Sequence, residues 1–198
     1  MPPHYRADLT AGSLKLPESR VIADLLLRGV DAREWRREII ERNVLQVRNP
    51  ATARRLTRLI RGRLETMGPD LWTLVRTGSG PVAVQALLAA AVKHSDLLAD
   101  FLVLVVGEQY RLFQPRLNPA LFDSFLTGCR ERDPQMPLWS ETTCRRLRSS
   151  VFQILAQAGY LENTRTLRLQ TVHLAPQVVQ YLQLHHETAV LRCLQVAP

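Results

Sequence analysis

The segment Ala51–Leu64, with the sequence ATARRLTRLIRGRL, restricts the possible fold more than any other part of the chain. Its apolar residues recur every three or four positions, at Ala53, Leu56, Ile60 and Leu64. The series continues beyond the segment to Met67. A helix turns by about 100° per residue, so this spacing places them on one stripe. The segment therefore predicts an amphipathic helix that packs one side against a core.

The opposite side of this predicted helix is basic. The segment contains five arginines and no acidic residue. Arg54, Arg58 and Arg61 form a second stripe, roughly a third of a turn from the apolar one, and Arg55 lies beyond it. A solvated helix normally mixes signs, because opposite charges three or four residues apart attract each other. The counter-charges are therefore expected elsewhere.

Two interpretations of the basic face remain open. It is either an ordinary solvated surface, partly neutralised by Glu34, Glu38 or Glu41 of the preceding segment, or a phosphate-binding surface. The 198-residue chain has a net charge of +8 and a pI near 10.2. Such a balance favours a polyanionic partner, either nucleic acid or an anionic membrane surface. Nearly all of the positive charge is arginine, whose guanidinium group can bind phosphate and guanine through two hydrogen bonds.

The most apolar region, Pro81–Val106, does not fit a membrane span. A span needs about 20 predominantly apolar residues, and this region is interrupted by polar and charged side chains at Gln85, Lys93, His94, Asp96 and Asp100. We expect two buried helices here. The N-terminus lacks the apolar run of a signal peptide. The cysteines are odd in number and widely spaced, which favours neither a disulfide framework nor a zinc site. We therefore expect a soluble, cytoplasmic protein without a membrane partner.

The N-terminal part of the chain predicts a helical domain, residues 1–110. One amphipathic helix covers Pro17–Gly29, a second begins after Asp31, and the basic helix covers residues 49–67. Three short helices joined by short turns are the architecture of helix-turn-helix modules. The fold class predicted for the whole chain is mainly α.

The C-terminal part, residues 111–198, predicts a winged helix-turn-helix-like domain. Asn118–Arg130 is the positioning helix, and a second helix runs from Ser140, an N-cap residue, to Gly159. Two short segments around the polar tip at residues 162–166 then predict a β-hairpin, or wing. Whether the tail at residues 189–198 forms a docked strand or is free stays open.

The second predicted helix of this domain has a polar side suited to a DNA groove. The major groove admits a helix whose short or forked side chains reach base edges and phosphates. The side chains predicted to face the groove are Thr142, Arg145, Arg146 and Ser149, and those predicted to hold the backbone from the wing are Arg165 and Arg168. The alternative is a winged-helix fold used for protein contacts, because a fold does not fix a function.

No sequence motif for catalysis is found. The chain has no glycine-rich phosphate loop, no GxSxG or HExxH motif, and no paired carboxylates that indicate acid–base chemistry. We expect a protein that is not an enzyme and uses neither a cofactor nor a metal.

Several landmarks, in order along the chain, resemble the BrxA family, which is encoded in bacteriophage exclusion (BREX) defence loci. They are YRADLTAGSLKLPESRVIADLLL from Tyr5, TARR…RLIRGRL from Thr52, LLADF from Leu97, WSETT…AGYL from Trp139 and LQTVHLAPQVVQYL from Leu169. The resemblance covers essentially the whole chain. It implies a cytoplasmic, largely helical protein that binds double-stranded DNA alongside other BREX proteins, and it supplies no catalytic residues.

Three further functions compete with non-specific DNA binding. The chain could be an adaptor whose arginines dock an acidic partner protein, an RNA-binding helical protein, or a sequence-specific repressor. Because phosphate contacts carry no sequence information directly, we expect weak sequence preference.

Overall fold

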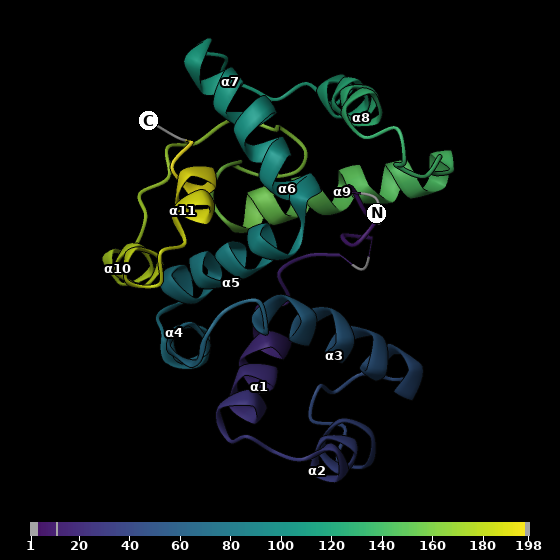
Figure 1. Ribbon diagram of the computed structural model, residues 1–198, viewed down its shortest axis with the longest axis vertical. Coiled ribbons are helices and arrows are strands. Elements are labelled where there is room, and N and C mark those ends of the chain that lie inside the picture. Colours follow the sequence, from purple (N-terminus) through teal and green to yellow (C-terminus); the bar gives the residue numbers. More distant parts are fainter. Residues whose placement is uncertain (1–3, 11, 197–198) are drawn as a thin grey trace. The chain divides into compact units, whose positions relative to one another are not determined.

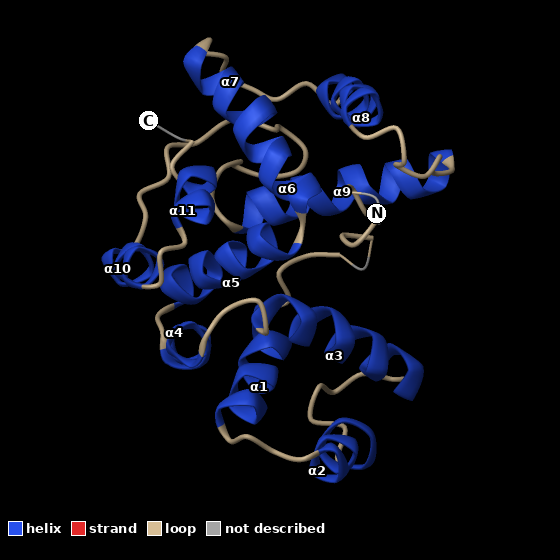
Figure 2. Cartoon of the chain, in the orientation of Figure 1, coloured by secondary structure: helices blue, strands red, loops and turns tan. Residues whose placement is uncertain are grey.

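The computed structural model describes residues 4–10 and 12–196, and all regular elements in this part of the chain are helices (Figure 2). The predicted mainly α fold is confirmed. The chain divides into two compact units. Unit 1 comprises residues 1–13, 95–174 and 182–198, and unit 2 comprises residues 14–94 and 175–181. The boundary expected between residues 110 and 111 lies inside unit 1.

Unit 2 contains the three helices predicted near the N-terminus and two more (Figure 1). Gly29 follows the first helix with a φ of 61°, a left-handed conformation that glycine adopts at little cost. The side chains of Asp31 and Asn49 cap the next helices by accepting hydrogen bonds from the N–H groups of Glu34 at 2.8 Å and Ala51 at 2.7 Å. The elements are α1 (Leu16–Leu27), α2 (Ala32–Arg36), η1 (Arg37–Glu41, a π-helical continuation of α2), α3 (Pro50–Leu64), α4 (Pro69–Thr77) and α5 (Gly80–His94).

Helix α5 organises the core of unit 2. It contacts α1, α3 and α4, and α1 also packs along α4. The alanines of α5 are fully buried, and their small side chains let the neighbouring helices approach closely. Helix α3 contacts α1 and η1 as well. The orientation of α3 is therefore fixed by three neighbours.

The apolar region at residues 81–106 forms two successive helical segments, as predicted. Helix α5 ends at His94, and a new helix begins at Asp96 after the buried Ser95. Within residues 4–10 and 12–196, no helix combines the length and apolar character that crossing a bilayer requires.

Unit 1 is built from the following helices and from loops that connect them: α6 (Asp96–Asp100), η2 (Phe101–Val106, π-helical), α7 (Gly107–Arg111), α8 (Ala120–Arg132), α9 (Glu141–Gln157) and α11 (Thr188–Leu194). The segments α6, η2 and α7 follow one another without a break. The residues of α10 (Pro176–Leu184) are divided between the two units.

Four phenylalanines form the centre of the unit 1 core. The ring of Phe101 in η2 lies between 5.2 and 6.2 Å from the rings of Phe122 and Phe125 in α8 and of Phe152 in α9, measured between centroids. All four side chains are buried. Aromatic rings at such distances attract each other beyond the effect of their buried area. This cluster holds α8 and α9 to η2.

The predicted β-hairpin after α9 is wrong, because no strand forms between residues 159 and 171. Leu161 and Leu169 form one isolated antiparallel bridge, and Arg168 forms another with Arg116. The three short segments around these bridges are therefore paired at one residue each and do not form a continuous ladder.

The reason lies in the local conformation of the tip. The side chain of Asn163 accepts hydrogen bonds from the backbone N–H groups of Arg165 at 2.8 Å and Thr166 at 2.9 Å. Leu167 has a φ of 50°, outside the range of a strand. Local hydrogen bonds from a side chain compete with a ladder between strands, so the tip is a compact turn.

The C-terminal tail docks as a helix. Val190, Cys193 and Leu194 of α11 are buried, and α11 contacts α6 and η2. The hydroxyl of the buried Tyr160 donates a hydrogen bond to the carbonyl oxygen of Leu194. The segment after α9 and helix α11 are thereby joined within unit 1.

We predict that Phe101→Ala lowers the free energy of unfolding by about 3–4 kcal/mol, because it leaves a cavity among the four rings. Chemical denaturation monitored by circular dichroism measures this change. Phe113→Ala is the matched control, because the Phe113 residue is 93% exposed, and its effect is expected to stay below about 0.5 kcal/mol. Equal effects of the two substitutions would contradict this description of the core.

Candidate nucleic-acid interface

Helix α3 presents the predicted basic face to solvent. The five residues of its predicted apolar stripe are each at most 5% exposed. Because this stripe packs against the neighbouring helices of unit 2, the other side of the helix must face outward. The four predicted arginines are all exposed: Arg54, Arg55, Arg58 and Arg61. The fifth, Arg63, is buried.

One of the four predicted arginines has an internal counter-charge. The Nε of Arg61 lies 2.6 Å from the Oε1 of Glu65, one turn later on the same face. Its guanidinium carbon also lies 4.9 Å from the centroid of the Trp35 ring, in cation–π geometry. Glu65 directly follows the segment Ala51–Leu64, so the segment itself contains no acidic residue.

Two of the three carboxylates expected to neutralise the face are engaged elsewhere, and the third, Glu41, is exposed and forms no ion pair in the described part of the chain. Glu34 pairs with Arg28, and Glu38 pairs with Arg42 at 2.8 Å. Arg54, Arg55 and Arg58 form no ion pair within the described part of the chain. Three adjacent guanidinium groups are therefore exposed without a carboxylate partner from the described residues.

The second predicted face, on α9 in unit 1, is built as expected at its start. The hydroxyl of Ser140 accepts a hydrogen bond from the N–H of Thr143 at 3.3 Å and so caps the helix. The residues predicted to face a DNA groove are exposed: Thr142, Arg145, Arg146 and Ser149. Arg145 lies 3.6 Å from Glu141, an exposed pair on one helix that contributes little.

A hollow of about 390 Å³ joins part of α9 to the tip of the following loop. Arg145 and Ser149 line it together with Thr164. Thr142 and Arg146 are not part of its lining. Arg148 also lines the hollow and pairs with Asp123 of α8 at 3.0 Å. Arg148 was not among the residues predicted from the sequence. Its position three residues after Arg145 could have indicated it, because residues three apart lie on the same side of a helix.

The two arginines assigned to the tip are exposed but differ in their setting. Arg165 lies in the turn that the Asn163 side chain holds. Arg168 lies in the segment bridged to Arg116. Neither side chain lines the hollow. The tip thus places two basic side chains beside α9 without a regular hairpin.

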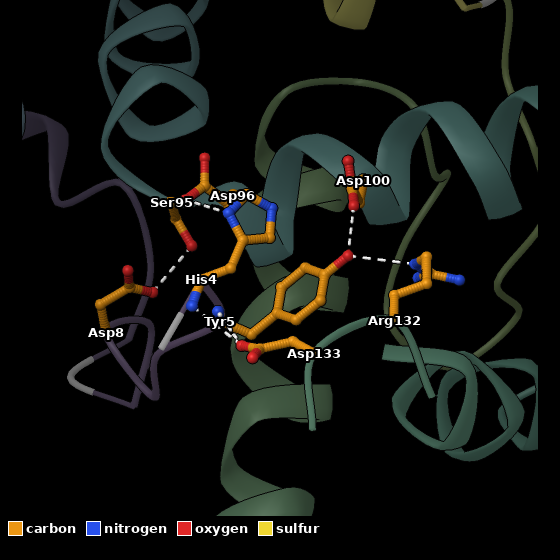
Figure 3. A network of polar contacts seen from close by, with 8 residues as sticks. All are labelled: His4, Tyr5, Asp8, Ser95, Asp96, Asp100, Arg132 and Asp133. Carbon is orange, nitrogen blue, oxygen red and sulfur yellow. Dashed lines mark hydrogen bonds and ion pairs between the residues drawn. The ribbon is translucent and has the colours of Figure 1, made fainter. Parts of the chain in front are cut away.

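A separate polar network fastens the N-terminal segment to unit 1 (Figure 3). The Tyr5 hydroxyl donates a hydrogen bond to Asp100 Oδ2 at 2.6 Å and accepts one from Arg132 Nε at 3.2 Å. The backbone N–H groups of His4 and Tyr5 both donate to Asp133 Oδ2, at 2.8 and 3.3 Å. These contacts connect the segment to α6 and to the end of α8.

The titration behaviour of this network favours a structural role. Burial, followed by the hydrogen bond to Asp100, raises the pKa of Tyr5 to about 12. Burial raises the pKa of the nearby Cys129 thiol to about 11. Both groups are thus protonated near neutral pH, whereas a nucleophilic thiol or a general base acts in its deprotonated form. Within the described residues, no group of three or more His, Cys, Asp or Glu side chains is arranged to hold a metal.

The fold and the two arginine-bearing faces define a helical protein with exposed cationic surfaces on two separate units. A family model described as BrxA matches residues 3–186. Two similar proteins are each called BREX protein BrxA. That of Paramagnetospirillum magneticum (strain ATCC 700264 / AMB-1) is 51% identical over 195 residues, which are 98% of this chain and 98% of that protein. That of Escherichia coli O9:H4 (strain HS) is 35% identical over 176 residues, covering 89% of this chain and 83% of that one.

The likeness extends to a solved structure. The crystal structure of an uncharacterized protein from Magnetospirillum magneticum has a TM-score of 0.91 and 49% identity, covering 98% of this chain and 100% of that one. The chain belongs to the BrxA family, as its landmarks predicted.

We predict that Tyr5→Phe lowers the free energy of unfolding by about 1–2 kcal/mol, because Asp100 and Arg132 lose a shared hydrogen-bond partner. Urea denaturation at neutral pH measures the change. Thr10→Val is the control, since the exposed Thr10 hydroxyl bonds only to the nearby Ala7 carbonyl, and it is expected to change stability by less than about 0.5 kcal/mol. A Tyr5→Phe protein as stable as wild type would show that the network does not fasten the segment.

Proposed function

We propose that this chain is a non-enzymatic, double-stranded DNA-binding protein of a BREX phage-defence system. It acts in the cytoplasm together with other BREX proteins. Membership in a family whose relatives are called BREX protein BrxA supports the defence role. The net charge of +8 supports a polyanionic partner.

The observation that carries the proposal is the unmatched charge on α3. Arg54, Arg55 and Arg58 are exposed, adjacent and without an ion pair in the described part of the chain. Like charges this close repel one another, so an arrangement of this kind is stabilised when an external anion approaches. Phosphates along a duplex supply such anions, and their binding releases counterions.

The surface around α9 contributes a second set of contacts. Arg145, Ser149 and Thr164 converge on one hollow. The exposed arginines of the tip lie in the turn that follows α9. We assign α9 to a groove of the duplex and the tip to the adjacent backbone.

The expected specificity is weak. Phosphate contacts position a protein but do not read bases, and α9 carries few of the Asn and Gln side chains that recognise adenine through two hydrogen bonds, namely Gln153 and Gln157 near its end. The protein is expected to bind duplexes of unrelated sequence with similar affinity.

A second candidate function, a protein adaptor within the defence complex, is favoured by one observation. Phe113 is 93% exposed and has a φ of 53° at the end of α7. The positive φ belongs to the turn that ends α7, in which the N–H groups of Phe113 and Gln114 bond back to the carbonyl groups of Tyr110 and Gln109. A large aromatic residue gains nothing from full exposure, so the exposed ring favours a contact with a partner.

We predict that Arg54→Ala/Arg58→Ala weakens binding to a random-sequence duplex about tenfold at low salt. The plot of log affinity against log salt is expected to become less steep by about 2, because each lost phosphate contact removes about 0.9 from the slope. Fluorescence anisotropy over a salt series measures both quantities.

The matched control is Arg28→Ala/Arg76→Ala, which removes the same charge from the same unit. Arg28 and Arg76 already pair with Asp24, so their loss is expected to leave the slope unchanged. Equal effects of the two variants would assign binding to net charge alone and not to α3. Circular dichroism confirms that each variant is folded.

We further predict that Arg145→Ala/Arg146→Ala and Arg165→Ala/Arg168→Ala each lower duplex affinity about three- to tenfold. Arg111→Ala/Arg192→Ala, two exposed arginines of unit 1 outside the predicted face, serves as the control. Wild-type affinity in both test variants would exclude α9 and the tip from the interface.

Competition separates the rival functions. Plasmid DNA should displace a labelled duplex and leave an adaptor bound to its partner protein. A structured RNA of matched length should compete more weakly than duplex DNA. Stronger competition by the RNA would replace the DNA proposal with RNA binding.

A further inference from the structure

A groove of about 760 Å³ opens between the α2–η1 segment and α3, entirely within unit 2. Pockets of 300–1,000 Å³ are the usual size for small ligands in proteins. The wall on the α3 side includes Arg54, Arg58 and Arg61, and Arg36 joins them from the opposite side. The four guanidinium groups belong to exposed residues. We call these four exposed arginines the rim of the groove.

The charge of this rim is largely uncompensated. Four arginines line the groove against a single carboxylate, Glu65, which Arg61 holds at 2.6 Å. Arg36, Arg54 and Arg58 form no ion pair in the described part of the chain. A net excess of three positive charges favours a ligand that carries several negative charges close together, and guanidinium groups bind phosphate oxygens in particular.

One part of the groove is apolar. It is lined by Trp35, Ile39 and Ile40, which are buried or half-buried. The Arg61 guanidinium group lies over the Trp35 ring. Thr57 also lines the groove. Its hydroxyl oxygen is buried and has no hydrogen-bond partner among the described residues, so it is an unsatisfied polar group in the wall of the groove.

Phosphates of a duplex lying across α3 do not explain this apolar part. The outer face of a duplex is convex and carries its charge on the backbone. It meets the exposed arginines, whereas the aromatic ring and the two isoleucines are less exposed and carry no charge that matches a phosphate. A ligand that uses the whole groove must combine a flat, largely apolar group with a cluster of negative charges.

We propose that this groove binds a nucleoside diphosphate or triphosphate. The base lies against the two isoleucines and the part of the Trp35 ring that the Arg61 guanidinium group does not cover, where contact with an aromatic ring stabilises it. The phosphates lie at the rim, bound by Arg36, Arg54 and Arg58. This site is separate from the proposed DNA contacts in chemistry, although it shares two arginines with them.

Calorimetry with ATP, tripolyphosphate and adenosine tests the proposal on the full chain. Tripolyphosphate carries a charge like that of ATP but has no base, and adenosine has the base without the charge. ATP is expected to bind at least tenfold more tightly than tripolyphosphate, and adenosine at least a hundredfold more weakly than ATP. Equal affinities for ATP and tripolyphosphate would overturn the proposal, because the apolar surface would then contribute nothing.

Two variants locate the site. Arg54→Ala/Arg58→Ala is expected to weaken ATP binding at least tenfold, whereas the charge-matched Arg28→Ala/Arg76→Ala keeps it within twofold. In wild type, ATP is expected to quench tryptophan fluorescence. Trp35→Phe keeps an aromatic ring, so it should remove the quenching while changing ATP affinity less than threefold. Quenching that persists in Trp35→Phe, or ATP affinity unaffected by loss of Arg54 and Arg58, would refute this location.

The same proteins in the duplex assay distinguish this proposal from DNA binding. Duplex binding without ATP binding would remove the nucleotide site and leave the DNA proposal intact. ATP binding that is lost in Arg54→Ala/Arg58→Ala, with duplex affinity unchanged, would support the nucleotide site and remove α3 from the DNA interface.

Discussion

Burial of one apolar stripe on α3 determines where the arginines of that helix can lie. Ala53, Leu56, Ile60 and Leu64 are almost fully buried against neighbouring helices of unit 2. Turning the helix to cover its arginines would expose this stripe, and each large aliphatic side chain brought into water costs about 1.5–3 kcal/mol. The fold therefore holds the guanidinium groups at the surface. The mutual repulsion of these charges is tolerated because it costs less free energy than burial of the apolar stripe gains.

The consequence of this constraint is a cationic surface whose counter-charges are largely absent from the described chain. Glu34 and Glu38 are already paired with Arg28 and Arg42, and Glu65 is paired with Arg61. The groove next to α3 adds an apolar surface to the same charges, and the hollow next to α9 adds a second cationic contact in unit 1. Both interactions proposed for these surfaces, with a duplex and with a nucleotide, follow from one imbalance of charge.

Periodicity and capping residues predicted most helices of the chain, because a buried stripe and an N-cap are local signals. They were sufficient for α3 and for the start of α9 at Ser140. The wing was predicted wrongly, since a pattern of alternating residues does not reveal that the Asn163 side chain holds the turn and that Leu167 adopts a positive φ. The groove was missed for another reason. Trp35 and the arginines of α3 are far apart in sequence, and only packing brings them together.

Chemical modification of arginines, read by mass spectrometry with and without a random-sequence duplex, tests the central claim most directly. Phenylglyoxal reacts with exposed guanidinium groups that have no tightly bound anion. The account predicts that Arg54, Arg55 and Arg58 react readily in the free protein and are protected by the duplex, whereas the already paired Arg28 and Arg76 react equally in both samples. Equal modification of the three α3 arginines with and without DNA would contradict it.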